Sequence, residues 1–390
     1  MSPAPDRSMS LAPANVSDYR ELARLRLPRQ LFDYIDGGAY EERTMSENVA
    51  ALQRMRLRQR VLRDVSDIDL SVEVLGRRWA LPVALAPLGL AGMFAKRAEA
   101  DAARAATDAG VPFCESTVSI CSVEEVRGAT DGPLWFQLYV MRDRAYAESL
   151  MARAQAAGCE VLVVTVDLAV VGARYRDTRN GMITSVSMGG RLARAWDIAS
   201  HPGWVLDVAL GGRPLTFGNL EDAVPGARTP QDFRGWVDAQ FDPSVTWDDL
   251  AWVRAHWPGK VVLKGILDPE DARRAVAVGA DAIVVSNHGG RQLDGVSSTA
   301  DALPRVVEVV GGELPVLVDG GIRSGLDVVK MLSLGATACL IGRAWAYAVA
   351  GGGQAGVRHM LQVIEDEMRV AMALTGNASL AELGPQTIER

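Results

Sequence analysis

One of the four histidines in this chain, His288, lies three residues before Arg291 in a glycine-rich segment. The segment is Ser286-Asn287-His288-Gly289-Gly290-Arg291-Gln292-Leu293-Asp294-Gly295, and it follows the apolar run 282–285, which predicts a buried strand. Imidazole can accept a proton near neutral pH, and a guanidinium can bind a carboxylate through two parallel hydrogen bonds. Such a pair suits an enzyme that oxidises a carboxylic acid at its α-carbon. Taken alone, the motif is equally compatible with a polar loop whose histidine is structural.

The composition argues against several classes of protein. The chain has 390 residues, of which 48% are hydrophobic and 23% charged, and its net charge of −7 argues against nucleic acid as a partner. Cys114, Cys121, Cys159 and Cys339 show no metal-binding spacing, so we expect reduced cysteines, no metal site and a cytoplasmic protein. Residues 1–14 lack the apolar core of a signal peptide, and no run of about 18 uncharged apolar residues would span a membrane.

Eight short apolar runs predict eight strands. The runs are rich in β-branched residues and do not alternate with polar ones, which is typical of strands buried on both faces of a parallel sheet. The predicted strands are Leu81–Ala86, Val111–Cys114, Leu134–Leu138, Val161–Val166, Lys260–Leu263, Ala282–Val285, Leu314–Val318 and Ala338–Ile341.

Amphipathic stretches of helical length separate most of these strands. Four of the stretches are followed by an Ala-Gly or Gly-Ala pair, at 109–110, 157–158, 279–280 and 335–336, which is typical of a helix end. These helices are predicted over Arg97–Ala109, Asp143–Ala157, Pro269–Val278 and Ser324–Leu334. Eight alternating strand and helix units predict an α/β fold, the TIM (β/α)8 barrel.

Two segments lie outside the regular strand–helix alternation. Residues 17–80 predict a helical leader that contains a hairpin over Val72–Trp79, and the barrel follows over residues 81–375. Residues 178–245 separate the fourth and fifth strands and are too long for an ordinary loop, so we predict an insert there. The insert contains interleaved apolar, tryptophan and arginine residues, which favours either a membrane-docking surface or a lid. We interpret residues 1–390 as one domain.

Polar and glycine residues follow almost every predicted strand, where TIM barrels have their active sites. The last two strands are followed by glycine and arginine, at 320–323 and 342–343, a pattern that favours a phosphate-bearing cofactor. Lys264 ends an apolar strand although the chain has only four lysines, and a buried cation is costly unless it is paired. A fixed ammonium there would stabilise a ring that gains negative charge.

Five segments together carry a resemblance to a known family. They are Phe32-Asp33-Tyr34-Ile35-Asp36-Gly37-Gly38-Ala39, Trp135-Phe136-Gln137-Leu138-Tyr139-Val140, Gly172-Ala173-Arg174-Tyr175-Arg176-Asp177, Lys264-Gly265-Ile266-Leu267-Asp268-Pro269-Glu270-Asp271-Ala272 and Ser286–Arg291. From about residue 17 to residue 375 the chain resembles the FMN-dependent α-hydroxy-acid oxidase and dehydrogenase family, and within it the bacterial respiratory L-lactate dehydrogenases most.

The resemblance implies catalytic and substrate-binding roles for six residues. His288 would be the catalytic base, and Asp167 the carboxylate that holds it and stabilises its protonated form. Tyr139 would hydrogen-bond the substrate hydroxyl and align it. The substrate carboxylate would be bound by Arg174, Arg291 and Tyr34.

FMN is the cofactor that the resemblance implies. Its ring would be contacted near the first five barrel strands, and its ribityl and phosphate groups near the last three. The implied contacts are Pro87, Gly89, Ser116, Gln137, Thr165, Lys264, Ser286, Asp319, Gly321, Arg323, Gly342 and Arg343.

The implied reaction is the oxidation of an L-2-hydroxy acid, with L-lactate as the first candidate, to the 2-oxo acid. Electrons would pass to a quinone or another carrier, and the chain would form a homo-tetramer in peripheral contact with the inner face of the cell membrane. Two alternatives stay open: an oxidase that reduces O₂ to hydrogen peroxide, and a dehydrogenase for a larger substrate such as mandelate. The second is favoured by Gly89, Val118 and Val171, small groups at the edge of the expected side-chain pocket.

Overall fold

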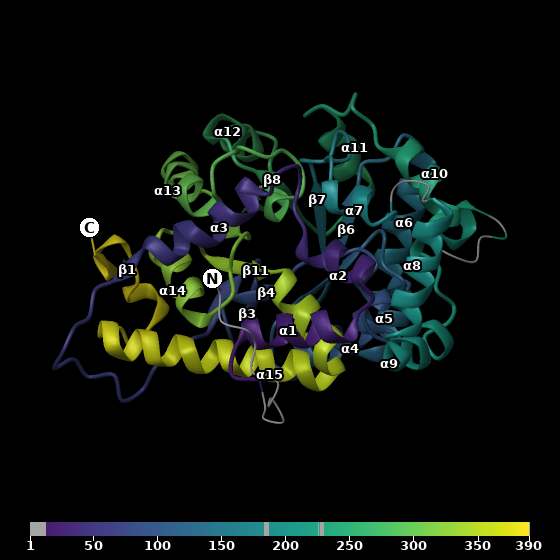
Figure 1. Cartoon of the computed structure of the whole chain (residues 1–390). Coiled ribbons are helices and arrows are strands. Elements are labelled where there is room, and N and C mark those ends of the chain that lie inside the picture. The colour runs from purple at the N-terminus through teal and green to yellow at the C-terminus, as the bar shows by residue number, and fades with distance from the viewer. Residues whose placement is uncertain (1–12, 183–186, 225, 227–229, 390) are drawn as a thin grey trace.

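The computed structural model describes residues 13–182, 187–224, 226 and 230–389. Eight parallel strands close into a barrel in the order β10-β11-β4-β5-β6-β7-β8-β9, and helices surround it (Figure 1). Nearly every strand residue is buried, as the unbroken apolar runs predict. The predicted TIM barrel is therefore confirmed. Its strands are β4 Val83–Leu85, β5 Phe113–Ser116, β6 Leu134–Tyr139, β7 Val161–Thr165, β8 Lys260–Ile266, β9 Ala282–Val285, β10 Val316–Val318 and β11 Ala338–Ile341.

The ends of several strands differ from the predicted ones by up to three residues. β5 begins and ends two residues later than predicted, because the pairing of Phe113 with Leu134 and of Ser116 with Gln137 sets its limits. A search for apolar runs misses the C-terminal end of β5, because Glu115 and Ser116 are polar. β8 continues past the predicted end through an irregularity at Gly265, whose φ is 112°. These corrections matter because strand ends carry the site.

The four barrel helices whose limits were predicted, α4, α6, α12 and α14, agree with the prediction to within one residue at each end. At Gly110, Gly158, Gly279 and Gly335, φ is 67°, 74°, 75° and 103°, the left-handed region that glycine favours at a helix end. The helices are α4 Ala98–Asp108, α5 Val123–Ala129, α6 Arg144–Ala156, α12 Pro269–Ala277, α13 Thr299–Val310, α14 Gly325–Ser333 and α15 Arg343–Thr375.

The leader contains α1 Val16–Arg26, α2 Arg29–Asp36 and α3 Arg43–Arg54, and α1 packs along α15 (Figure 1). The predicted hairpin is confirmed as β2 Val72–Val74 paired with β3 Arg77–Trp79. A second pair was not predicted: β1 Arg56–Leu57 pairs with β12 Ile388–Glu389. It brings the C-terminal segment back to the leader.

The insert between β7 and β8 is largely helical. Three contacts fix it to the leader and to η1 Ala91–Met93: the Trp204 indole donates to the Met93 carbonyl (2.8 Å), Arg29 N–H donates to Asp197 (2.8 Å), and Arg26 pairs with Asp207. No helix in the described part of the chain is long and apolar enough to cross a membrane. The elements of this region are α7 Tyr175–Arg179, α8 Met188–Ala199, α9 Pro202–Trp204, η2 Val205–Leu210, η3 Gly218–Ala223, α10 Pro230–Gln240 and α11 Asp249–His256.

Candidate active site

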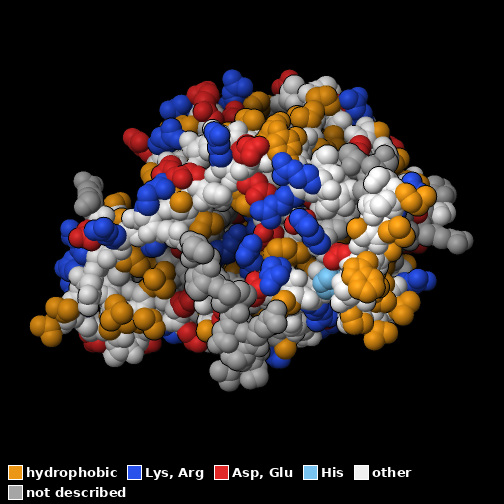
Figure 2. Space-filling model, viewed as in Figure 1, with side chains coloured by type: hydrophobic (Ala, Val, Ile, Leu, Met, Phe, Trp, Pro, Cys, Tyr) orange, Lys and Arg blue, Asp and Glu red, His pale blue; other side chains and the backbone are white. Residues whose placement is uncertain are grey.

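A cavity of about 1000 Å³, counted to its open mouth, lies at the C-terminal ends of the barrel strands. Basic side chains gather in a hollow on this face of the molecule (Figure 2). The cavity brings together most residues that the sequence analysis singled out. Those in its lining are Tyr34, Pro87, Gly89, Gln137, Tyr139, Thr165, Arg174, Lys264, His288, Arg291, Asp319, Gly321, Arg323, Gly342 and Arg343.

His288 is held by Asp167 beside this cavity. Its Nδ1 lies 2.9 Å from Asp167 Oδ1, and its backbone N–H donates to Ser286 Oγ at 3.0 Å. Burial raises the pKa of Asp167, but the charge and hydrogen bond of His288, with Lys264 nearby, outweigh it and the pKa lies below its usual value. The His288 backbone has a φ of 57°, a left-handed conformation that is uncommon for non-glycine residues. The pair can orient the imidazole and stabilise its protonated form.

Gly265 makes room for the Asp167 side chain. A Cβ at position 265 would lie 2.6 Å from Asp167 Cγ, and φ at this glycine is 112°. Any other residue here would displace the carboxylate or strain the strand. The irregularity in β8 thus serves the histidine–aspartate pair.

Two arginines share one wall of the cavity without a close acidic partner. Arg291 donates to the backbone carbonyls of Tyr34 (2.6 Å) and Gly37 (2.9 Å) and lies over the Tyr34 ring. Burial and the charge of Arg174 lower the pKa of Arg291 to about 10. The nearest carboxylate to Arg174 belongs to Asp177, at 3.9 Å, and Arg174 Nε is buried without a hydrogen-bond partner. Two like charges held this way would be stabilised by a carboxylate ligand.

Tyr139 faces the same cavity with a neutral phenol. Burial, together with the nearby Tyr34 and Asp167, raises its pKa above the usual value. Its ring packs edge-on against Phe241 of the segment that follows α10. The hydroxyl can therefore donate or accept a hydrogen bond but does not ionise near neutral pH.

The expected pairing of Lys264 is present. Its Nζ lies 2.8 Å from Asp319 Oδ2 and donates to Ser286 Oγ at 3.0 Å. Burial lowers the pKa of Lys264, but Asp319 and Asp167 outweigh it, so the pKa is raised and the side chain stays cationic. Next to it, Gln137 Nε2 is buried without a partner. A fixed cation and an uncommitted amide donor fit a flavin ring, which carries several acceptor atoms.

At the far end of the cavity, only some of the residues expected to bind a phosphate are available to do so. Gly320 and Gly321, with φ of 98° and 81°, line this end and pack closely against Thr299 and Asn48, and Arg323 Nη1 donates to the adjacent Ile322 carbonyl. Arg343 also lines the cavity, yet its guanidinium donates to three backbone carbonyls of the leader and the histidine loop, and burial with the Arg291 charge lowers its pKa to about 9. Those carbonyls belong to Ile35, Gly37 and Gly289. Among the arginines here, Arg323 is the more available for a phosphate.

Three predicted site residues lie outside the lining. Asp167 stands behind His288, Ser286 behind Lys264 and His288, and Ser116 donates to Gln137 Oε1 at 3.1 Å. Each reaches the cavity through a neighbour. Contact of Ser116 and Ser286 with the cofactor therefore stays a prediction, and both side chains lie beside residues that line the cavity.

Two leader residues that hold the site together were not predicted. Asp36 accepts hydrogen bonds from Arg20 (2.6 Å), Arg176 (2.9 Å) and Tyr347 (2.9 Å). Burial raises its pKa, but these partners, Arg20 above all, hold it at about 2. Asn48 exchanges two hydrogen bonds of 2.8 Å with Asn287 beside the catalytic candidate. A tertiary contact of this kind leaves no local signal, although Asp36 stands in the Tyr34-to-Gly38 motif.

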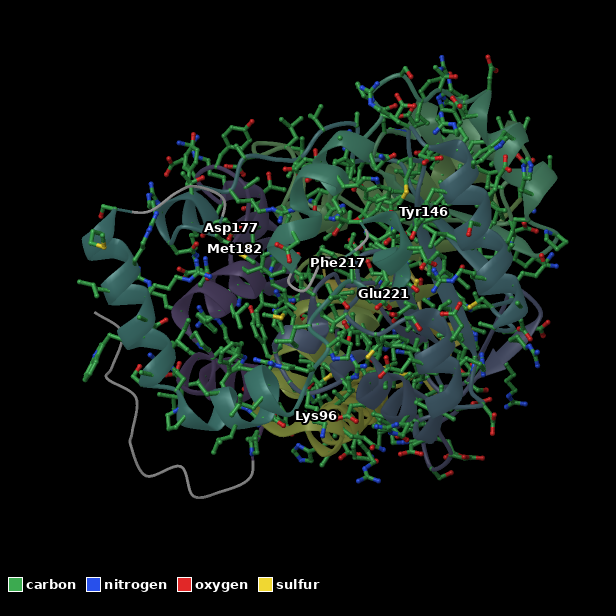
Figure 3. The ribbon with its side chains drawn as sticks, turned by 90° about the vertical axis from the view of Figure 1, so that its right-hand side faces the viewer. Lys96, Tyr146, Asp177, Met182, Phe217 and Glu221 are labelled. Atoms are coloured by element: carbon green, nitrogen blue, oxygen red, sulfur yellow. The ribbon has the colours of Figure 1, made fainter. Side chains whose placement is uncertain are left out.

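A second, more apolar cavity of about 990 Å³, counted to its open mouth, adjoins the first and shares Tyr34, Val118, Tyr139, Arg174 and His288 with it. Figure 3 views this side of the molecule and labels Asp177, Met182 and Phe217, which also line it. A Cβ at Gly89 would come within 2.7 Å of Val118 Cγ2 at its edge. Its remaining lining is Leu90, Leu168, Val171, Val237, Asp238 and Phe241.

Comparisons with known proteins place the chain among proteins that agree with this fold and site. The family model described as FMN-dependent dehydrogenase matches residues 23–390. The L-lactate dehydrogenase of Caulobacter vibrioides is 57% identical over 95% of this chain and 96% of that protein, and that of Xanthomonas euvesicatoria is 56% identical over 96% of each.

Two solved structures are similar over the whole fold. The monotopic membrane protein (S)-mandelate dehydrogenase is 38% identical, with a TM-score of 0.91 over 97% of this chain and 100% of that one. A mandelate oxidase variant with (S)-mandelic acid is 40% identical, with a TM-score of 0.81 over 97% and 98%. Given the family match over nearly the whole chain and relatives of this identity, the protein belongs to the FMN-dependent dehydrogenase family and takes FMN as its cofactor.

Proposed function

We propose that this FMN-dependent dehydrogenase oxidises an L-2-hydroxy acid, with L-lactate as the first candidate, to the 2-oxo acid. The observation that carries the proposal is that His288, paired with Asp167 at 2.9 Å, lines one cavity together with the half-buried Arg174 and Arg291. A base and an anion site in the same cavity are what the α-carbon of a hydroxy carboxylate requires. The curated relatives named L-lactate dehydrogenase support the choice of substrate.

When bound, FMN would supply a two-electron acceptor. Gln137, Thr165 and Lys264 would hold its ring, and the glycines at 320–321 with Arg323 would hold its phosphate end. The ammonium of Lys264 offsets negative charge that the ring gains on reduction.

The substrate carboxylate lies between Arg174 and Arg291, with the Tyr34 hydroxyl as a further donor. Tyr139 forms one hydrogen bond with the substrate hydroxyl, as donor or as acceptor. This bond fixes the orientation of the α-carbon and its hydrogen. His288, with Nδ1–H donating to Asp167, presents the lone pair of Nε2 and takes the substrate proton. The Asp167 carboxylate then stabilises the imidazolium.

A larger aliphatic or aryl 2-hydroxy acid is the second candidate. The apolar cavity beside His288, about 990 Å³ counted to its open mouth, offers apolar lining for a side chain larger than the methyl group of lactate. The (S)-mandelate dehydrogenase structure of similar fold supports this candidate.

Anaerobic mixing of the oxidised holoenzyme with L- and D-2-hydroxy acids tests the proposal. We expect L-lactate or a larger L-acid to bleach the flavin absorbance, and D-acids to leave it unchanged. Re-oxidation of the bleached enzyme by air or by a quinone then distinguishes an oxidase from a dehydrogenase. If no 2-hydroxy acid bleaches the flavin, the proposed substrate class is wrong.

Peripheral membrane contact is part of the proposal. Met188, Leu192 and Trp196 form one face of α8 and are 72%, 67% and 77% exposed. Leu206 and Leu210 of η2 are also exposed, and Figure 2 shows hydrophobic side chains gathered on this part of the surface. An exposed apolar stripe on a helix suits a lipid surface. The inner face of the cell membrane remains the predicted location, and a tetramer the predicted assembly.

A further inference from the structure

A third cavity lies beneath α8. α8 has 12 residues and none of them is fully buried; Ile198 on its inner face packs partly buried against the core, beside the cavity. The space measures about 530 Å³, counted to its mouth. Its walls come from the start of α2, from η1 and from the insert. They are Pro28, Gln30, Leu31, Leu90, Met93, Met182, Arg194, Asp197, Ile198 and Trp204.

The chemistry of this cavity suits a neutral ring that carries a carbonyl oxygen. Most of the lining is apolar, and Gln30 Nε2 is buried without a hydrogen-bond partner. A buried amide donor left unpaired is costly, and an acceptor on a ligand would remove that cost. Arg194 and Asp197 both line the cavity, so their charges balance and an anionic ligand gains little.

The position of the cavity links the flavin site to the apolar surface. Leu90 and Met182 line both this cavity and the second, apolar cavity, which adjoins the cavity of the flavin site, so a single layer of side chains separates the α8 cavity from the apolar one. Leu90 N–H donates to the Val118 carbonyl (3.0 Å), which fixes that wall. On the outer side, α8 carries the exposed stripe Met188, Leu192 and Trp196. A ligand with a lipid tail could enter from a membrane and place its ring one layer from the apolar cavity that adjoins the flavin site.

We propose that the cavity beneath α8 binds the ring of a membrane quinone, the oxidising substrate of the enzyme, with Gln30 donating to one quinone carbonyl. This inference rests on the proposed function. Over one cycle, two electrons and two protons leave the hydroxy acid, whose C–OH becomes C=O. The two electrons cross the layer of side chains that contains Leu90 and reduce the quinone. Its two carbonyls become hydroxyls by taking two protons from solvent, which balances the two protons that oxidation of the hydroxy acid releases to solvent.

Two variants and one control test the site in the FMN-loaded enzyme. Ile198→Trp fills the cavity, Gln30→Leu removes the donor, and Ala199→Trp adds the same indole at the next, exposed position of α8. Binding of 2,3-dimethoxy-5-methyl-1,4-benzoquinone to the oxidised enzyme is measured by calorimetry, with saturating oxalate in the substrate site. We expect Kd to rise more than about tenfold for Ile198→Trp and about three- to tenfold for Gln30→Leu, the loss of one hydrogen bond. Ala199→Trp should bind as the unaltered protein does.

Anaerobic bleaching of the flavin by the hydroxy acid separates this inference from the proposed function. All three variants should bleach within twofold of the unaltered rate, and re-oxidation by ferricyanide should be unchanged, while re-oxidation by the quinone falls only in the two cavity variants. If oxalate abolishes quinone binding, or if Ile198→Trp and Gln30→Leu bind the quinone normally, the quinone does not use this cavity. If no 2-hydroxy acid bleaches the flavin of the unaltered protein, the proposed function is wrong instead.

Discussion

Asp36 of α2 and Arg176 of α7 form an ion pair of 2.9 Å, and each lies two residues beyond a candidate for binding the substrate carboxylate. Tyr34 precedes Asp36, and Arg174 precedes Arg176. The pair therefore fixes the distance between a leader element and the start of the insert across the mouth of the site. Asp36 is buried and also binds Arg20 and Tyr347, so the pair belongs to a network and not to the surface.

Replacing Asp36 with asparagine should loosen this arrangement. We expect KM for the hydroxy acid to rise several-fold while kcat for flavin reduction changes less, because the chemical groups themselves remain. Arg24→Gln, which breaks an exposed pair with Glu21 on the same leader, is the control and should leave both constants unchanged. A fall in kcat with unchanged KM would contradict a role in substrate positioning.

Replacing Asp36 with asparagine should also change how the free energy of unfolding depends on pH. The pKa of Asp36 in the folded protein is about 2, below its usual 3.8, so its ionised form stabilises the fold above about pH 4. That contribution, at most about 2 kcal/mol, should disappear as the pH falls from 4 towards 2. Urea unfolding of both proteins should give a difference that is constant from pH 5 to 7 and shrinks below pH 4. A difference that grows on acidification would refute the assignment.

Binding of the substrate carboxylate should depend on the planar guanidinium groups of Arg174 and Arg291. Arg174→Lys and Arg291→Lys keep the charge but lose bidentate geometry, so we expect kcat/KM to fall about 10- to 100-fold in each. Arg273→Lys, on an exposed face of α12, serves as the control. Unchanged kcat/KM in both variants would mean that another group binds the carboxylate.

Val118 should discriminate between substrates of different size. Val118→Phe narrows the apolar cavity, so kcat/KM for an aryl 2-hydroxy acid should fall at least about tenfold more than for L-lactate. Equal effects on both substrates would show that the side chain of the larger acid does not occupy this cavity.

The exposed stripe of α8 should mediate membrane contact. Substituting serine for Met188, Leu192 and Trp196 together should lower binding to anionic lipid vesicles more than about tenfold, because three apolar side chains no longer leave water. Val61→Ser with Leu62→Ser, equally exposed but on the leader, should not change binding. Vesicle binding that survives the triple substitution would remove α8 from the contact.

The sequence predicted those features that depend on local pattern. The eight barrel strands follow from apolar runs, the helix ends from glycines such as Gly110 and Gly335, and the site from what stands at the strand ends. Contacts between distant segments were missed, because nothing near Asp36 or Asn48 in the chain reveals a partner more than a hundred residues away. The polar end of β5 was missed for the opposite reason: strand pairing there overrides composition. The cavity beneath α8 depends on how the insert docks, which no periodicity encodes.

The central claim is that His288, held by Asp167, takes the proton of a 2-hydroxy acid. Its most direct test is the anaerobic rate of flavin bleaching by L-lactate in the unaltered protein and in His288→Ala, with the FMN content of both measured. We predict equal FMN content and a rate about 10²- to 10⁴-fold lower in the variant, as loss of a general base causes. Bleaching of His288→Ala at the unaltered rate would contradict the assignment.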